Sequence, residues 1–365
     1  MSTLLKDLYA PAFYDRFAAI LMKVMPSFDK ALFLEKILTM EFQEMELKQR
    51  MKHTTAVLHE FLPVKYADTV KLIEKIIKEL RKAGESGLVY MFLPDYIETY
   101  GLEHYDHSVK ALEFITQFIT CEFALRPFII KYGDRMIDQM TRWSLHENHH
   151  VRRFASEGSR PRLPWAMALP ALKKDPSPIL PLLDNLKNDP EEWVRRSVAN
   201  NLNDIAKDHP QIVLEIAARW KGIGKETDAI IKHGSRTLLK QGHAEILKFY
   251  GLESHQLDLS GFKVITPQVQ SGQHLAFSFT VLNNHRQPQT VRIEYAIYYR
   301  KQNGTLSRKV FKISERVYQP GEKVSVVRKQ SFRPITTRTF YPGEHRVGVV
   351  INGEEKASDS FVLAG

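Results

Sequence analysis

The spacing of hydrophobic residues changes near residue 256, and this change limits the possible folds more than any other feature of the chain. Before it, apolar side chains recur at helical intervals, as in Val70, Ile73, Ile76 and Ile77. After it, apolar and polar residues alternate, as in Val291, Ile293, Tyr295, Ile297 and Tyr299, which indicates strands with one buried face. The chain is therefore predicted to be mainly α, with an all-helical domain over residues 1–254 and an all-β domain over residues 257–365.

The β-domain is predicted to be a basic, immunoglobulin-like sandwich. Turn dipeptides at Asn303-Gly304, Pro320-Gly321 and Asn352-Gly353 help to divide it into about seven strands. It holds 16 Lys and Arg and 8 Asp and Glu, a net charge of +8 out of +10 for the whole chain. This charge favours a polyanionic partner such as DNA, although a basic surface can also serve solubility alone. The candidate contacts are Arg300, Lys301, Arg308, Lys309, Arg328, Lys329, Arg333 and Arg338.

A repeat lies inside the helical segment. Residues 151–157 (VRRFASE) recur as residues 194–200 (VRRSVAN), an offset of 43 that is typical of HEAT-like helical pairs. Such pairs stack into a solenoid, the concave side of which binds elongated partners.

In the second copy, two faces of one helix can be assigned. The apolar face holds Val194, Val198, Leu202 and Ile205, and another face holds Trp193, Arg196, Asn200, Asp204 and Lys207. In the first copy, His150, Arg153 and Glu157 take the matching positions. Cations on this face can hold phosphates while a carboxylate meets a sugar. The alternative is that the arginines and carboxylates only link neighbouring repeats.

No metal and no cofactor are expected. His146, Glu147 and His150 match the H-E-x-x-H pattern of zinc peptidases, which needs both histidines on one helix. The repeat offset instead aligns Glu147 with Pro190, in a turn between helices. The single cysteine, Cys121, excludes a disulfide framework or a cysteine-clustered metal site, and its apolar surroundings indicate a buried side chain.

The chain also shows no signal for a membrane. No stretch approaches the ~18 apolar residues of a membrane-spanning helix. Lys6 and Asp7 interrupt the first apolar run, where a signal peptide would be continuous. We expect a cytoplasmic monomer that is associated with the nucleoid when it is bound to DNA.

Four stretches carry a family resemblance: CEFALRPF (121–128), VRRFASEGSRPRLPWA (151–166), VRRSVANNLNDIAKDHP (194–210) and HGSRTLLKQG (233–242). Together they resemble the AlkC-type DNA glycosylases of the HEAT-like alkylation-repair superfamily, several of which carry an immunoglobulin-like C-terminal domain. The resemblance implies base excision repair of cationic N3-alkylated bases, 3-methyladenine and 3-methylcytosine, in double-stranded DNA. It also implies that the damaged base stays at least partly stacked rather than fully flipped.

On the matching positions, the candidate active-site residues are Glu122, Glu157, Trp165 and Asp204. Breaking the N-glycosidic bond builds positive charge on the deoxyribose, and a carboxylate can stabilise that charge and orient water. We expect Glu157 and Asp204 at C1′ and Glu122 near the cationic base. Trp165 is expected to pack on the sugar or backbone, with ordinary core packing as the alternative.

Phosphate contacts are predicted for a separate group of cations: Arg153, Arg160, Arg162, Arg196 and Lys207. Helix capping or ion pairs between repeats are the alternatives for these side chains. Two other functions stay open for the whole chain, namely a non-enzymatic helical scaffold for protein partners and a DNA-damage binder without catalytic activity. Release of a free methylated base from damaged DNA distinguishes the enzyme from both.

Overall fold

The computed structural model describes residues 4–335 and 338–364. The chain forms two compact units, Met1–Gly234 and Ser235–Gly365. Two short helices, α15 (Arg236–Gln241) and α16 (Ala244–Phe249), therefore belong with the strands by contact. The division predicted from sequence, at residues 254–257, follows the change of secondary structure instead and stays a prediction.

The first unit is built from helices. They are α1 (Pro11–Val24), α2 (Lys30–Ile37), α3 (Leu47–Phe61), α4 (Tyr66–Lys82), α5 (Phe92–Tyr100), α6 (Tyr105–Ile115), α7 (Glu122–Tyr132), α8 (Asp134–Trp143), α9 (His149–Gly158), α10 (Pro170–Lys174), α11 (Leu180–Asn185), α12 (Glu192–Ile205), α13 (Pro210–Trp220) and α14 (Lys225–Gly234). Short 3-10 turns are η1 (Leu5–Leu8), η2 (Glu41–Glu44), η3 (Leu88–Met91) and η4 (Ser177–Ile179). Across the described parts of both units, no helix combines the length and hydropathy that crossing a bilayer requires.

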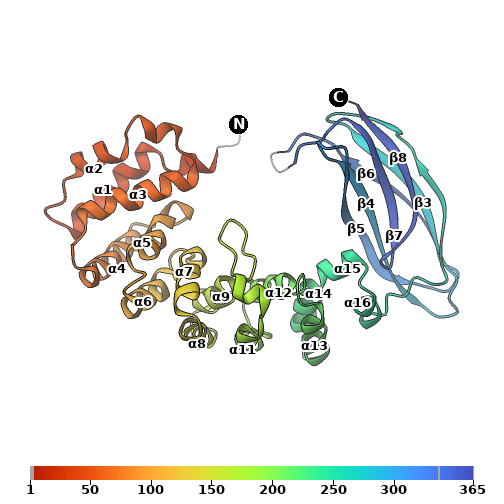
Figure 1. The fold of residues 1–365 in the computed structure, drawn as a ribbon, viewed down its shortest axis with the longest axis horizontal. Helices are drawn as coiled ribbons and strands as arrows, with labels where there is room; N and C mark the ends of the chain where they lie inside the picture. The colour runs from red at the N-terminus through yellow and green to blue at the C-terminus, as the bar shows by residue number, and fades with distance from the viewer. Residues whose placement is uncertain (1–3, 336–337, 365) are drawn as a thin grey trace. The chain divides into compact units, whose positions relative to one another are not determined.

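One row of helices runs along the inner side of this unit. In the row α3, α5, α7, α9, α12 and α14, each helix packs on the next, while α6, α8, α11 and α13 lie on the outer side (Figure 1). The apolar stripe predicted on α12 is confirmed, because Val194, Val198, Leu202 and Ile205 are all buried. The mainly α fold with a following β-sandwich is therefore as predicted.

Glycine brings two pairs of inner helices close together. A Cβ atom on Gly158 of α9 would lie 2.4 Å from a methyl group of Leu125 on α7. A Cβ atom on Gly234 of α14 would lie 2.8 Å from the Cβ atom of Leu202 on α12. Any larger residue at either position would force its neighbour to move, so these glycines allow α9 to lie close to α7 and α14 to lie close to α12.

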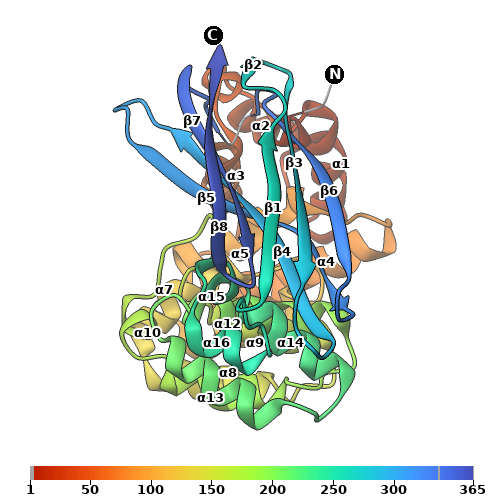
Figure 2. The ribbon, with the colours of Figure 1, turned by 90° about the vertical axis from the view of Figure 1, so that its right-hand side faces the viewer.

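The second unit is a two-layered sandwich. Its strands are β1 (Leu257–Val264), β2 (Gln268–Gln270), β3 (His274–Asn283), β4 (Gln289–Arg300), β5 (Leu306–Tyr318), β6 (Lys323–Ser331), β7 (Gly343–Ile351) and β8 (Glu354–Ala364). One sheet has the order β1-β3-β6 and the other β2-β8-β7-β4-β5, with the β2–β8 pair parallel and the others antiparallel (Figure 2). The alternating residues of β3, β4 and β7 form the core between the sheets.

The predicted turns lie between neighbouring strands. Asn303-Gly304 joins β4 to β5, and Asn352-Gly353 joins β7 to β8. Asn352 and Gly353 have φ angles of 47° and 81°, the left-handed conformations that a two-residue hairpin requires. The sequence signal was reliable here because the requirement for positive φ is local to the dipeptide.

Candidate active site

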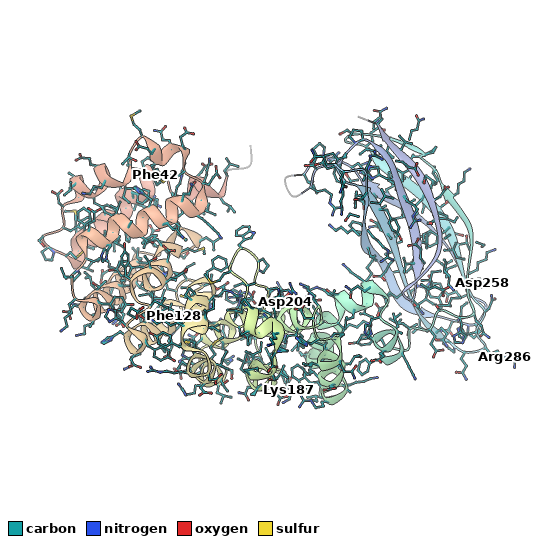
Figure 3. The ribbon with its side chains drawn as sticks, viewed as in Figure 1. Phe42, Phe128, Lys187, Asp204, Asp258 and Arg286 are labelled. Carbon is teal, nitrogen blue, oxygen red and sulfur yellow. The ribbon has the colours of Figure 1, made fainter. Side chains whose placement is uncertain are left out.

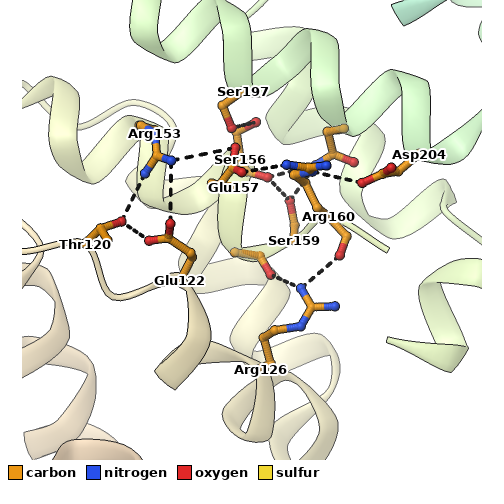
Figure 4. Close-up of polar contacts among 12 residues, drawn as sticks. Thr120, Glu122, Arg126, Arg153, Ser156, Glu157, Ser159, Arg160, Ser197 and Asp204 are labelled. Atoms are coloured by element: carbon orange, nitrogen blue, oxygen red, sulfur yellow. Dashed lines mark hydrogen bonds and ion pairs between the residues drawn. The ribbon is translucent and has the colours of Figure 1, made fainter. Parts of the chain in front are cut away.

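Three carboxylates from three successive inner helices form the centre of the candidate site. Glu122 is the first residue of α7, Glu157 lies in the last turn of α9, and Asp204 lies in the last turn of α12. Their exposed fractions are only 8%, 6% and 1%. Figure 3 marks Asp204 on the inner row, and Figure 4 shows that all three belong to one connected polar network.

Arg153 joins the first two carboxylates. A guanidinium nitrogen lies 3.5 Å from Glu122 Oε1 and 4.0 Å from Glu157 Oε2. Another donates to the hydroxyl of Thr120 at 3.1 Å, and Thr120 in turn donates to Glu122 (Figure 4). The guanidinium also stacks on Trp193, 4.2 Å from the ring centre. Arg153 is therefore held on four sides and faces the carboxylates.

Arg160 joins Glu157 to the third carboxylate, Asp204. Its Nη1 donates to Glu157 Oε1 at 2.7 Å, and its Nε donates to Asp204 Oδ2 at 2.9 Å. The second oxygen of Asp204 accepts from Lys207 at 2.8 Å. Burial lowers the pKa of Arg160, but the charges of Glu157 and Asp204 outweigh it and hold the pKa above the ordinary value. Arg160 is therefore a permanent cation that fixes two carboxylates.

One carboxylate oxygen stays available in this network. Within the described residues, Glu157 Oε2 accepts no hydrogen bond, and a guanidinium nitrogen of Arg153 lies 4.0 Å from it. Burial raises the pKa of the Glu122 carboxyl group, and the charge of Arg153 together with a backbone hydrogen bond opposes that rise without cancelling it. The site thus contains one carboxylate oxygen without a hydrogen bond and, in Glu122, a carboxyl group that its burial makes easier to protonate.

Arg126 binds the backbone next to the carboxylates. It is fully buried on α7 and donates to the backbone carbonyls of Gly158 at 3.2 Å and Arg160 at 2.9 Å (Figure 4). It also donates to the backbone carbonyl of Met167. Burial and the neighbouring charge of Arg160 lower its pKa to about 10. It therefore fixes the backbone at the end of α9 and the loop that follows.

Trp165 lies in that loop and is exposed. Its φ angle is 67°, an unusual value for a residue with a side chain, and 68% of its surface is accessible. Its carbonyl oxygen accepts from Lys48 Nζ, on α3. This exposure argues against core packing, which was the alternative considered for Trp165.

A pocket of about 160 Å³ lies between Trp165 and Glu122. Its walls are mainly apolar, and its lining residues are Leu5, Leu8, Tyr9, Leu47, Lys48, Met51, Leu88, Met91, Thr120, Glu122, Phe123 and Trp165. A carboxyl group in such a wall suits a flat organic cation, because the apolar surface lowers the local dielectric and strengthens attraction to the charge.

The predicted phosphate contacts divide into two groups. Arg153 and Arg160 are turned inward to the carboxylates, as described above, which is the linking arrangement considered as their alternative. Arg162 is more accessible and pairs with Asp208 at 2.5 and 2.8 Å. Arg196 is also accessible and pairs with Glu192 at 2.5 Å. Their contact with DNA stays a prediction, as does that of Lys207.

The histidines of the zinc-like pattern do not share a helix. His146 precedes α9, where its Nδ1 accepts from the backbone N–H of Asn148, and the helix begins at His149. Among the residues that the structure describes, no group of three His, Cys, Asp or Glu side chains is placed to hold a metal ion. Cys121 is buried, as predicted.

Three contributors to the site were not identified from the sequence: Thr120, Arg126 and Lys48. Arg126 falls within the stretch 121–128 that carries part of the resemblance, so the sequence drew attention to this position but did not indicate its role. Thr120 and Lys48 gave no local signal, because their contacts with Glu122 and Trp165 depend on how separate helices pack.

Comparison with known proteins gives consistent matches along the chain. Residues 44–219 match the family described as DNA alkylation repair enzyme, and residues 258–365 match the C-terminal Ig-like domain of YhaZ proteins. YhaZ of Bacillus subtilis (strain 168) is 43% identical over 358 residues, which cover 98% of both chains. The solved structure of Pseudomonas fluorescens alkylpurine DNA glycosylase AlkC, bound to DNA containing an abasic site analogue, has a TM-score of 0.94 and 36% identity over the full length of both chains.

Proposed function

Because this chain belongs to the AlkC-type DNA alkylation repair enzymes, we propose that it is a DNA glycosylase that excises cationic N3-alkylated bases, 3-methyladenine and 3-methylcytosine, from double-stranded DNA. The observation that carries the proposal is the convergence of Glu122, Glu157 and Asp204 on the half-buried Arg153 and the buried Arg160. The matched AlkC structure contains DNA, which supports DNA as the partner.

The chemistry of the substrate explains why carboxylates suffice. An N3-alkylated base already carries a positive charge, so it leaves as a neutral molecule and needs no strong acid. Departure of the base leaves positive charge on the deoxyribose, which nearby carboxylates stabilise. Water then adds to C1′, and its proton passes to a carboxylate or to solvent. We propose that the reaction therefore proceeds without a metal or cofactor.

The network suggests a division of roles. Glu157 presents its free Oε2 and is proposed to face C1′ and to orient the attacking water. Asp204 adds negative charge on the same side, held in place by Arg160 and Lys207. Arg153 and Arg160 are proposed mainly to position these carboxylates, because their guanidinium groups are already engaged.

Glu122 and Trp165 are proposed to face the damaged base. The carboxyl group of Glu122 attracts a cationic base over a neutral one, and its apolar pocket strengthens that preference. The exposed Trp165 can then pack against the sugar or backbone of the same nucleotide. In this arrangement, the damaged base is recognised at the mouth of a small pocket, so full flipping of the nucleotide is not required.

The enzyme is proposed to be monofunctional. Cutting the strand after base excision requires a neutral lysine amine that attacks C1′ of the abasic sugar. Lys207 instead donates to Asp204 at 2.8 Å, and Lys48 donates to the carbonyl oxygen of Trp165, so both amines are engaged elsewhere. We further propose that the protein acts as a cytoplasmic monomer, with Arg162, Arg196 and the basic β-domain contacting phosphates.

The proposal is tested by incubating the protein with methylated double-stranded DNA and measuring free base by chromatography. Release of 3-methyladenine, with abasic DNA left uncut, is the expected result. Binding to damaged DNA without release would identify a damage binder, and neither binding nor release would favour the helical scaffold. Strand cleavage at the abasic site without added base would contradict the monofunctional assignment.

A further inference from the structure

A cluster of cations lies on α1 and α4, away from the carboxylates. It is called the lysine patch here and consists of Lys23, Lys75, Lys78, Arg81 and Lys82. These side chains line a shallow hollow of about 500 Å³ together with Val24 and Glu79. All five cations are exposed. With one carboxylate among them, the local net charge is +4.

The charges of the patch are not explained by the fold. Only Lys82 pairs with Glu79, at 2.6 Å, whereas Lys23, Lys75 and Lys78 form no ion pair within the described residues. The buried stripe of α4 lies on a different side of the helix and is apolar, from Val70 to Leu80. Like charges three and four residues apart repel each other in an isolated helix. A fixed cluster of this kind therefore fits an external polyanion.

Side-chain contacts, together with the short segment that follows α6, connect the patch to the candidate site. Lys78 and Arg81 lie over the ring of Phe114 on α6, at 5.9 and 5.4 Å. Just after α6, Gln117 accepts from Asn148, the residue that caps the N-terminus of α9. The edge of the helical unit at which α4 and α6 end is therefore the edge at which α9 begins, and the patch lies near it.

The first turns of α9 and α12 continue this path. His150 packs edge-on against Trp193, with ring centres 5.4 Å apart, and Trp193 stacks on Arg153. Burial lowers the pKa of His150, and the charges of His149, Arg153 and Arg81 lower it further. Cations and aromatic rings thus lead from the patch to the arginine that holds Glu122 and Glu157.

We propose that the lysine patch binds the phosphate backbone of the duplex on one side of the damaged nucleotide. This inference rests on the proposed glycosylase function and extends its DNA footprint to α1 and α4. Two to three helix-packing steps of ~8–10 Å separate α4 from α9, a path of about 20–30 Å. At ~3.4 Å for each base pair, the contacted phosphates lie roughly six to nine base pairs from the lesion.

This geometry predicts an asymmetric footprint, which can be tested with two damaged duplexes. Each has roughly 20 base pairs and the same base composition, with the lesion about four base pairs from one end or from the other. The variant Lys75→Gln/Lys78→Gln removes two unpaired charges of the patch. The control, Lys65→Gln/Lys71→Gln, removes two exposed charges at the opposite end of the same helix. Half-saturating enzyme concentrations for single-turnover excision are measured at several salt concentrations.

The patch variant should affect only the duplex whose long arm reaches α4. For that duplex, loss of two phosphate contacts should lower the salt slope by about 2. Wild type should then lose about 12-fold more affinity than the variant between roughly 50 and 200 mM salt. The other duplex, and the control variant with either duplex, should behave as wild type.

Other outcomes overturn the inference. Equal loss with both duplexes, equal loss in the control variant, or no change in slope would show that the patch does not bind one arm of the substrate. Thermal unfolding of both variants verifies that they are folded. Excision by wild type in both duplexes supports the proposed function independently of the patch. Absence of excision from both would contradict the proposed function itself and, with it, a lesion-centred footprint.

Discussion

Replacing Asp204 with asparagine tests whether buried negative charge drives the proposed reaction. The side chain keeps its shape but loses its charge. Both oxygens of Asp204 now accept from cations, Arg160 at 2.9 Å and Lys207 at 2.8 Å. In Asp204→Asn, an NH₂ group must face one of these donors, so one buried hydrogen bond is lost.

The expected size of both effects follows from these contacts. A unit negative charge ~4 Å from the sugar stabilises the developing positive charge by about 4 kcal/mol at an effective dielectric of ~20. Arg160 and Lys207 offset part of this, so we expect a loss of about 2–4 kcal/mol, or ~30- to 1000-fold in rate. The mismatched hydrogen bond should lower the free energy of unfolding by about 1–3 kcal/mol, which leaves a typical domain folded.

Asp208→Asn is the matched control, because Asp208 also pairs with an arginine, Arg162, but on the surface. It should change stability by less than ~1 kcal/mol and leave the excision rate near that of wild type. The assay is single-turnover release of 3-methyladenine with enzyme in excess, beside urea unfolding of each variant. Folded Asp204→Asn with a wild-type rate would refute the electrostatic argument, and so would an equal loss in both variants.

Three further predictions concern DNA binding, packing and protonation. Arg196→Ala should lower the salt slope of DNA binding by about 1, and an unchanged slope would remove Arg196 from the phosphate contacts. Gly158→Ala should lower the free energy of unfolding in urea by about 1–3 kcal/mol, because its Cβ would lie 2.4 Å from Leu125. The excision rate should also fall, because α9 must move away from α7. Unchanged stability and an unchanged rate would contradict this tight fit. Burial, with help from Asp95, raises the pKa of Glu98 from 4.5 to about 7. The stabilising protonation of Glu98 is present below pH 4.5 and is lost as the pH rises through about 7. Over this range, the free energy of unfolding of wild type should therefore fall by up to about 3 kcal/mol relative to that of Glu98→Gln. A difference between the two proteins that stays constant with pH would contradict the shift.

The sequence by itself determined the two kinds of secondary structure and the faces of α12. The helical period determines where each residue points around its own helix, so the burial of Val194, Val198, Leu202 and Ile205 followed directly. The alternation of apolar and polar residues and the turn dipeptides likewise indicated the strands and turns of the β-sandwich, because both signals depend on only a few neighbouring residues. The positions of Glu122, Glu157, Trp165 and Asp204 were assigned by resemblance, not by these periods.

Only the tertiary structure decided which charges meet. The helical period says nothing about the spacing and offset between helices, and these set whether Arg160 reaches Asp204, 44 residues away, or a phosphate. For the same reason, the inward orientation of Arg153 and the support from Arg126 could not be read from the sequence. The exposure of Trp165 likewise depends on a loop with an unusual backbone angle, held by Lys48 from a distant helix.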